Sequence, residues 1–251
     1  MLPDDRSIFE SVCSQARRAM VLQTAADTLE WDERTGMPAG AGDYRASQVS
    51  TLQTMAHQMR TEAAYGEHLQ HLAGSTAGED PHGDVAATIR ELHRDWDRDR
   101  KLPDELVQKT VEARVRGQQS WDSARKDNDY SAFRDTLATL IELKREAGQR
   151  LSDGTDRTPY EALRDEYEPG ARVAALQKVF DDLRKPLVEL ISQIADAPNQ
   201  PNLAIVQQDF DLHAQRQFSR FVAEQVGFDF RRGRLDETSH PFCTTLGPSD
   251  C

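Results

Sequence analysis

The sequence predicts an all-α protein, and two observations carry this prediction. Apolar residues recur three or four positions apart along almost the whole chain, and this spacing places them on one face of a helix. No segment shows a sustained alternation of apolar and polar residues, which is the pattern of a half-buried strand. Helix start and stop signals stand between the periodic segments. We therefore expect many helices, with a short loop or strand segment near the C-terminus.

Three helices are expected in the first part of the chain. The first carries an apolar stripe made of Ile8, Val12, Ala16 and Ala19. The second should begin near Asp43 and run to Leu72, because Gly74 then supplies a stop signal. The stripe of the third is made of Val85, Ile89, Leu92 and Trp96. This third helix should end within the charged run 94–101, which we interpret as a solvated face.

Capping residues locate the next two helices. Pro103 suits the first turn of a fourth helix, because proline lacks an amide hydrogen that this position would leave unpaired. Acidic residues follow it directly and favour a helix N-terminus. Asn128 or Asp129 can cap a fifth helix, which should close at Gly154.

Two more helices are expected before the tail of the chain. The clearest stripe consists of Val173, Leu176, Phe180, Leu183, Leu187, Leu190, Ile191 and Ile194. Pro186 interrupts this stripe, so we expect a kink there rather than an end. A further helix should cover residues 203–226 and end at Gly227. The segment from there to Cys251 should be loop or short strand.

Charge and composition exclude several classes of partner. The formal net charge is -12, from 43 acidic and 31 basic residues, and an acidic surface repels the phosphate backbone of nucleic acids. No apolar run approaches the roughly 20 residues that span a bilayer, so membrane anchoring is not expected. Three cysteines, Cys13, Cys243 and Cys251, are odd in number and far apart. This pattern favours reduced thiols in a cytosolic protein over a disulfide framework.

No complete active site can be found from residue chemistry alone. A helical zinc protease needs His-Glu-x-x-His, which aims two imidazoles at one ion from one helix face, and none of the seven histidines stands in that pattern. The nearest approach is 67–71, where His68 and His71 are three apart, and we interpret it as surface helix. Carboxylates near a helix end are usually solvated or capping, so we interpret the acidic cluster 165–168 in this way rather than as a paired-carboxylate catalytic site. No Gly-x-Ser-x-Gly or Cys-based triad is evident.

Four segments, taken together and in order, resemble one family. They are Leu29-Glu30-Trp31-Asp32-Glu33-Arg34-Thr35-Gly36-Met37-Pro38, the segment 121–130 beginning Trp121-Asp122, the segment 160–170 ending Glu168-Pro169-Gly170, and the segment 227–242 ending His240-Pro241-Phe242. Each is weak alone. In combination, across nearly the whole chain, they are similar to the carboxypeptidase Taq family of zinc metallocarboxypeptidases.

The resemblance implies a fold, an activity and partners. It implies a multi-helix, groove-forming metallopeptidase fold, with residues 1–251 as the N-terminal helical part of one larger peptidase domain. Relatives carry zinc, or another divalent metal such as cobalt, at the groove floor and remove single residues from peptide C-termini. The implied setting is a cytoplasmic homodimer with peptide substrates.

The resemblance also implies which residues lie near substrate. His240, Pro241 and Phe242 match the family's His-Pro-Phe segment beside the groove, and Asp250 matches the first position of an Asp-x-Arg-x-Thr motif. The metal ligands and catalytic residues are expected beyond Cys251, so we expect this chain alone to bind no metal and to be inactive. The alternative is a non-catalytic helical binding module that has lost the metal site.

Overall fold

The computed structural model describes residues 2–78 and 80–251 and is all-α. Contacts divide the chain into two compact units. The first contains the residues up to Pro159 together with Asp236–Cys251, and the second is Tyr160–Leu235. Among the described residues, no helix combines the length and the apolar character needed to cross a membrane.

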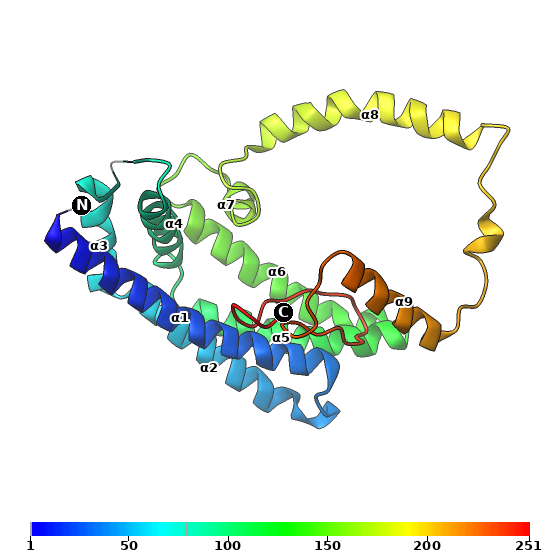
Figure 1. Ribbon diagram of the computed structural model, residues 1–251, viewed down its shortest axis with the longest axis horizontal. Helices are drawn as coiled ribbons and strands as arrows, with labels where there is room; N and C mark the ends of the chain where they lie inside the picture. Colours follow the sequence, from blue (N-terminus) through cyan, green and yellow to red (C-terminus); the bar gives the residue numbers. More distant parts are fainter. Residues whose placement is uncertain (1, 79) are drawn as a thin grey trace. The chain divides into compact units, whose positions relative to one another are not determined.

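The first unit is built on four long helices. They are α1 (Pro3–Thr35), α2 (Gly42–Thr61), α5 (Asp104–Lys126) and α6 (Tyr130–Ser152), with the short 3₁₀ turn η1 (Ala39–Ala41) between the first two. α1 and α2 lie side by side, α5 packs on α2, and α6 packs on α5 (Figure 1). A core cluster of Ala26, Ala46, Val49, Val111 and Val115 joins α1, α2 and α5. The small alanine side chains allow the first two helices to approach closely.

A second core cluster lies around the N-terminal part of α1. α3 (Ala63–Gly74), η2 (Thr76–Gly78) and α4 (Asp84–Asp99) form this region. The cluster consists of Val12, Tyr65, Leu69, Leu72, Ala77, Ile89 and Trp96. The helix expected over 43–72 is therefore two helices in the structure, separated at Glu62, whose backbone is extended (φ -54°, ψ 135°). The break lets Tyr65, Leu69 and Leu72 pack in this cluster, so tertiary burial decides a boundary that the apolar spacing does not show.

Helix ends in the first unit largely follow the sequence signals. Asp129 caps α6 by accepting hydrogen bonds from the backbone amides of Ser131 (3.0 Å) and Ala132 (3.3 Å). Gly154, with a left-handed φ of 68°, follows the end of this helix as expected. α4 differs from the prediction because it continues through the charged run to Asp99. Trp96 is buried at 8% exposure, and its packing holds this last turn in the helix.

The second unit contains α8 (Val173–Ala195), η3 (Leu203–Ile205) and α9 (Leu212–Gln225), and most of the six-residue helix α7 (Pro159–Arg164). α8 continues through Pro186, as the sequence predicts. The helix expected over 203–226 is wrong in its first half, because only η3 and an irregular segment occupy it. The reason is local: Asp211 caps α9 by accepting from the amide of Ala214 at 2.8 Å, which starts the helix there.

The tail 236–251 has no regular strand among its described residues. One isolated antiparallel bridge joins Gly247 and Asp250, and the amide of Leu246 donates to the carbonyl of Asp250 at 2.8 Å. Leu246 is buried at 9% exposure. The expected loop with a trace of strand is therefore present, and its apolar residues hold it on the helices of the first unit.

Candidate functional site

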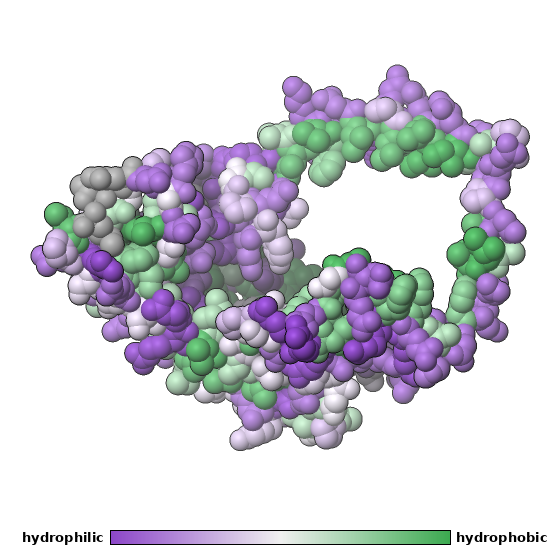
Figure 2. Space-filling model, viewed as in Figure 1, coloured by the Kyte–Doolittle hydropathy of each residue, from purple (hydrophilic) through white to green (hydrophobic). Residues whose placement is uncertain are grey.

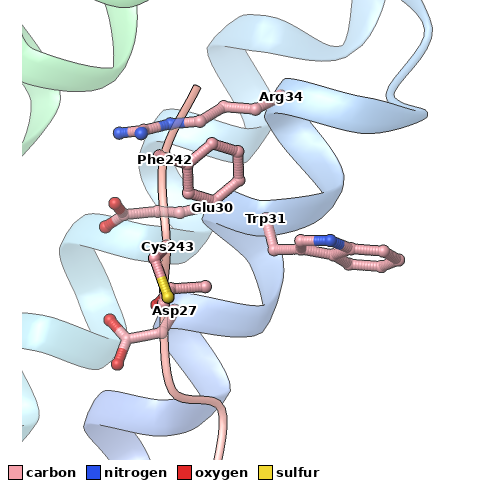
Figure 3. Close-up of a pocket in the computed structure, with 7 residues that line it drawn as sticks. Asp27, Glu30, Trp31, Arg34, Phe242 and Cys243 are labelled. Carbon is pink, nitrogen blue, oxygen red and sulfur yellow. The ribbon is translucent and has the colours of Figure 1, made fainter. Parts of the chain in front are cut away.

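A pocket of about 170 Å³ lies where the tail crosses the C-terminal part of α1 (Figure 3). It is lined by Asp27, Glu30, Trp31, Arg34, Phe242, Cys243 and Thr244. The four helical residues stand at spacings of three, four and seven, so they occupy neighbouring positions on successive turns of α1. The carboxylates and the guanidinium extend to the same side of α1, whereas Trp31 extends to the other (Figure 3).

Arg34 joins the helix to the tail. Its guanidinium carbon lies 4.7 Å from the centre of the Phe242 ring, within the range of a cation–π interaction. Its Nε atom is buried, and no hydrogen-bond partner for it exists among the described residues. The guanidinium therefore holds the Phe242 ring against α1.

Glu30 lies between Asp27 and Arg34 on α1, and its negative charge is balanced by its own hydrogen-bond partners. Both nitrogens of the Arg114 fork donate to its carboxylate at 2.6 Å, and Gln53 Nε2 donates to it at 2.9 Å. This bidentate geometry is the strong form of an arginine–carboxylate pair. Glu30 thus serves to tie α1 to α5 and α2.

Asp27 has a different environment from Glu30. Its carboxylate accepts one hydrogen bond from Gln23 Nε2 at 3.0 Å and forms no ion pair among the described residues. Burial raises the pKa of Asp27 above its ordinary value of 3.8, and the Gln23 hydrogen bond and the Arg114 charge only partly oppose this rise. Burial also raises the pKa of the nearby Glu33, which accepts from Gln119 Nε2 at 3.0 Å.

The end of α1 is held in place by α2. Arg45 Nη2 donates to the Asp32 carboxylate at 2.6 Å, and Nη1 donates to the Leu29 carbonyl at 2.5 Å. The amides of Gly36 and Met37 both donate to the Asp32 carbonyl at 2.9 Å and end the helix. The segment 29–38 therefore owes its position to Arg45, sixteen residues from Leu29.

The four residues expected near substrate occupy different places. Phe242 lines the pocket. His240 and Pro241 are exposed, and the His240 ring makes an edge contact with Trp121 of α5 at 5.7 Å between ring centres. Because a carbonyl only accepts, His240 Nδ1 carries a hydrogen and donates it to the Pro241 carbonyl at 3.0 Å. Asp250 lies in the turn beside Gly247 and does not line the pocket.

The pocket includes residues that sequence reasoning did not select as site residues. No sequence pattern singles out Asp27, and Glu30, Trp31 and Arg34 are notable only as members of the family-like segment 29–38. The signal that could have found them is their helical spacing, 27, 30, 31 and 34, at the end of a helix followed by Gly36. Phe242, the partner of Arg34, is 208 residues further along the sequence, so the pairing exists only in the folded chain.

Titratable residues outside the pocket have structural roles. His57 Nε2 donates to the Leu102 carbonyl at 2.8 Å and is buried. His71, in the 67–71 segment, contacts the buried Asp5 at 2.9 Å. Asp165, in the acidic cluster, accepts from the Gly170 amide at 2.8 Å. Within residues 2–78 and 80–251, no three His, Cys, Asp or Glu side chains gather closely enough to hold a metal ion.

The structure is thus all-helical, with a C-terminal tail that packs over the C-terminal part of α1. Comparison with known proteins places the chain in a family. The sequence model described as carboxypeptidase Taq (M32) metallopeptidase matches residues 11–251, so the chain belongs to this family.

Individual relatives agree with this assignment. The chain is 30% identical to thermostable carboxypeptidase 1 of Thermus thermophilus, over 96% of this chain and 49% of that protein. The crystal structure of BsuCP superposes with a TM-score of 0.89 at 26% identity, over 97% of this chain and 48% of the other. The M32 carboxypeptidase of Deinococcus radiodurans superposes with a TM-score of 0.78 at 27% identity, over 97% and 48%. The chain thus spans about half the length of the relatives that it matches.

Proposed function

We propose that this chain forms the N-terminal, groove-forming part of a metallocarboxypeptidase that removes single residues from peptide C-termini. The family match over residues 11–251 carries the proposal. The names of the relatives, which are carboxypeptidases, support the reaction class. The resemblance supports four further parts of the proposal: one larger peptidase domain, zinc or cobalt as the metal, a cytoplasmic location and a homodimeric whole protein.

The described residues do not fit the metal of such an enzyme. A catalytic zinc site takes three protein ligands of the His, Glu or Cys type around one ion, and the described residues offer no such group. We propose that the metal ligands lie in the part of the family fold that this chain does not cover. Alone, the chain is expected to be inactive.

This chain shapes the substrate-binding side of the groove and supplies charged groups to it. Phe242 offers an apolar surface beside Arg34, whose guanidinium is a cation of the kind that binds a carboxylate. His240 and Pro241 directly precede Phe242 in the sequence and are exposed, so a peptide can reach them. We also propose that Asp250 lies near substrate, because it matches the first position of the family's Asp-x-Arg-x-Thr motif.

The decisive experiment uses a hybrid in which this chain replaces the matching half of the Thermus thermophilus carboxypeptidase. We expect the hybrid to release C-terminal residues one at a time from an N-blocked tripeptide, with loss of activity on chelation and recovery with zinc or cobalt. The chain alone, with the same metals, should release nothing. Cleavage of internal bonds by the hybrid would contradict the carboxypeptidase assignment.

Variants of the hybrid test the substrate side. His240→Ala and Phe242→Ala should raise KM for the tripeptide more than they lower kcat, because these residues are proposed to bind rather than to react. Chelator-sensitive release by the chain alone would overturn the placement of the metal ligands. A folded, metal-loaded hybrid without activity would instead favour a helical binding module.

A further inference from the structure

One face of α8 is apolar over its whole length and is exposed. Phe180, Leu183, Leu190, Ile191 and Ile194 are between 50% and 60% exposed, and Leu187 is 43% exposed. They recur every three or four residues, which places them on one side of the helix. Figure 2 shows this side as a continuous hydrophobic band along α8, with hydrophilic residues on the opposite side.

This face requires a partner on physical grounds. α8 has no buried residue over its 23 positions. Most of the stability of a helix in a protein comes from packing an amphipathic face rather than from helix propensity, and this helix also contains Pro186, which removes one internal hydrogen bond. A contiguous apolar surface of this kind marks an interaction site. The pattern of the sequence and the exposure in the structure therefore point to the same missing contact.

The comparison with relatives indicates what the partner is. The chain, α8 included, superposes on the BsuCP structure over 97% of its length and covers 48% of that protein. The relatives thus contain a second half of similar size that has no counterpart in these 251 residues. We propose that the apolar face of α8 packs against polypeptide equivalent to that second half, so that the face is an internal interface of the complete carboxypeptidase fold. This inference rests on the proposed function.

The charge pattern agrees with an internal interface and not with a surface that binds charged partners. The apolar side, from Val173 to Ile194, contains no charged residue at its three- and four-residue spacings. Lys178, Lys185 and Glu189 lie on the opposite side by helical geometry, where they stay in water. A buried interface of a permanent assembly is apolar in the same way.

The test measures structure rather than activity, so it can fail independently of the proposed function. Hydrogen exchange of the α8 amides is compared between the 251-residue chain and the Thermus hybrid described above. We expect roughly 100-fold slower exchange in the hybrid, because burial suppresses local opening. Leu187→Asp should abolish this protection. Val188→Asp is the matched control, since Val188 is 59% exposed and lies off the apolar face, and it should leave the protection in place.

A second measurement covers the case in which the hybrid does not fold. Only residues 173–195 are placed into the complete Thermus enzyme, and its melting temperature is recorded. We expect Leu187→Asp in this graft to lower the melting temperature by roughly 5 °C or more relative to Val188→Asp. Equal effects of the two variants, or unchanged exchange of α8 in a folded hybrid, would overturn the inference. So would a dimer of the 251-residue chain that Leu187→Asp dissociates in sedimentation, because a second copy would then be the partner.

Discussion

Asp27 and Arg34 illustrate at the residue scale how the pocket distributes charge. They stand seven residues apart on α1, a distance of roughly 10 Å along the axis, and Glu30 between them is already paired with Arg114. Asp27 therefore keeps a single hydrogen bond, from Gln23, and Arg34 keeps its contact with the Phe242 ring. The result is a pocket with one weakly compensated carboxylate and one cation.

The raised pKa of Asp27 predicts a pH dependence of stability. An acid whose pKa is higher in the folded state contributes stability below its unfolded pKa and loses that contribution as pH rises through the folded pKa. Asp27→Asn should therefore be at least as stable as the parent chain at pH 7, with the difference vanishing near pH 3. Denaturant unfolding at several pH values measures this.

Asp229, whose pKa is shifted in the opposite direction, serves as the control for Asp27. A hydrogen bond from Arg231 lowers the pKa of Asp229 to about 2, so Asp229 contributes stability above its unfolded pKa and loses it in acid. Asp229→Asn should remove that small contribution at pH 7 rather than relieve a cost. If Asp27→Asn were the less stable variant at pH 7, the environment assigned to Asp27 would be wrong.

Phe242 should matter for how the tail is held. Phe242→Ala removes a half-buried ring and its contact with Arg34, so we expect a loss of about 1–2 kcal/mol in the free energy of unfolding. Phe218→Ala is a matched control, because Phe218 is 66% exposed and should change stability by less than about 0.5 kcal/mol. Equal losses for the two variants would show that the tail is not anchored through this ring.

At the scale of elements, the contact between α3 and α4 depends on one glycine. An added Cβ at Gly66 would lie 2.4 Å from two ring carbons of Trp96, which no side chain can occupy without displacement of the ring. Trp96 is buried at 8% exposure and belongs to the cluster around the N-terminal part of α1. The close approach of these two helices thus requires the residue without a side chain.

Gly66→Ala should destabilise the protein by about 1–3 kcal/mol, because the Trp96 ring must move out of a packed position. Gly74→Ala is the control on the same helix, since nothing lies within 4 Å of the Cβ that it would add. The control should leave stability unchanged or raise it by up to about 1 kcal/mol. Thermal or denaturant unfolding of the two variants shows whether the loss of stability comes from the clash with Trp96 or from a general intolerance of alanine in α3.

At the scale of the whole molecule, the two units differ in how much apolar surface they bury. The first unit contains both core clusters. In the second, α8 and α9 have no buried residues, and several of their largest apolar side chains are more than half exposed. Burial of apolar side chains is the main source of stability in a folded domain, so the two units should not be equally stable.

We expect this difference to be measurable in the 251-residue chain. Amides of α8 should exchange roughly 100-fold faster than those of α2, since local stability follows local burial. A dye that fluoresces on apolar surfaces should bind strongly, and thermal unfolding should be broad. A single sharp transition without dye binding would contradict this expectation.

Local sequence patterns are sufficient to predict the all-α class, most of the helices and the resemblance to the family. Apolar spacing is a local property, and so are the caps at Asp129 and Gly154, which the structure confirms. The segments 29–38 and 227–242 resemble the family by their sequences alone, independently of the contact between Arg34 and Phe242. Local patterns can specify these features because helix formation depends on residues only a few positions apart.

The break at Glu62 and the pocket, in contrast, depend on tertiary packing. The apolar spacing runs on through 43–72, and it is the cluster containing Tyr65 and Trp96 that favours two helices. The pairing of Arg34 with Phe242 joins residues far apart in the sequence, and no local pattern encodes which distant side chain fills a given space. Packing of separated segments is a property of the folded chain, because it depends on shapes that exist only once the helices have met.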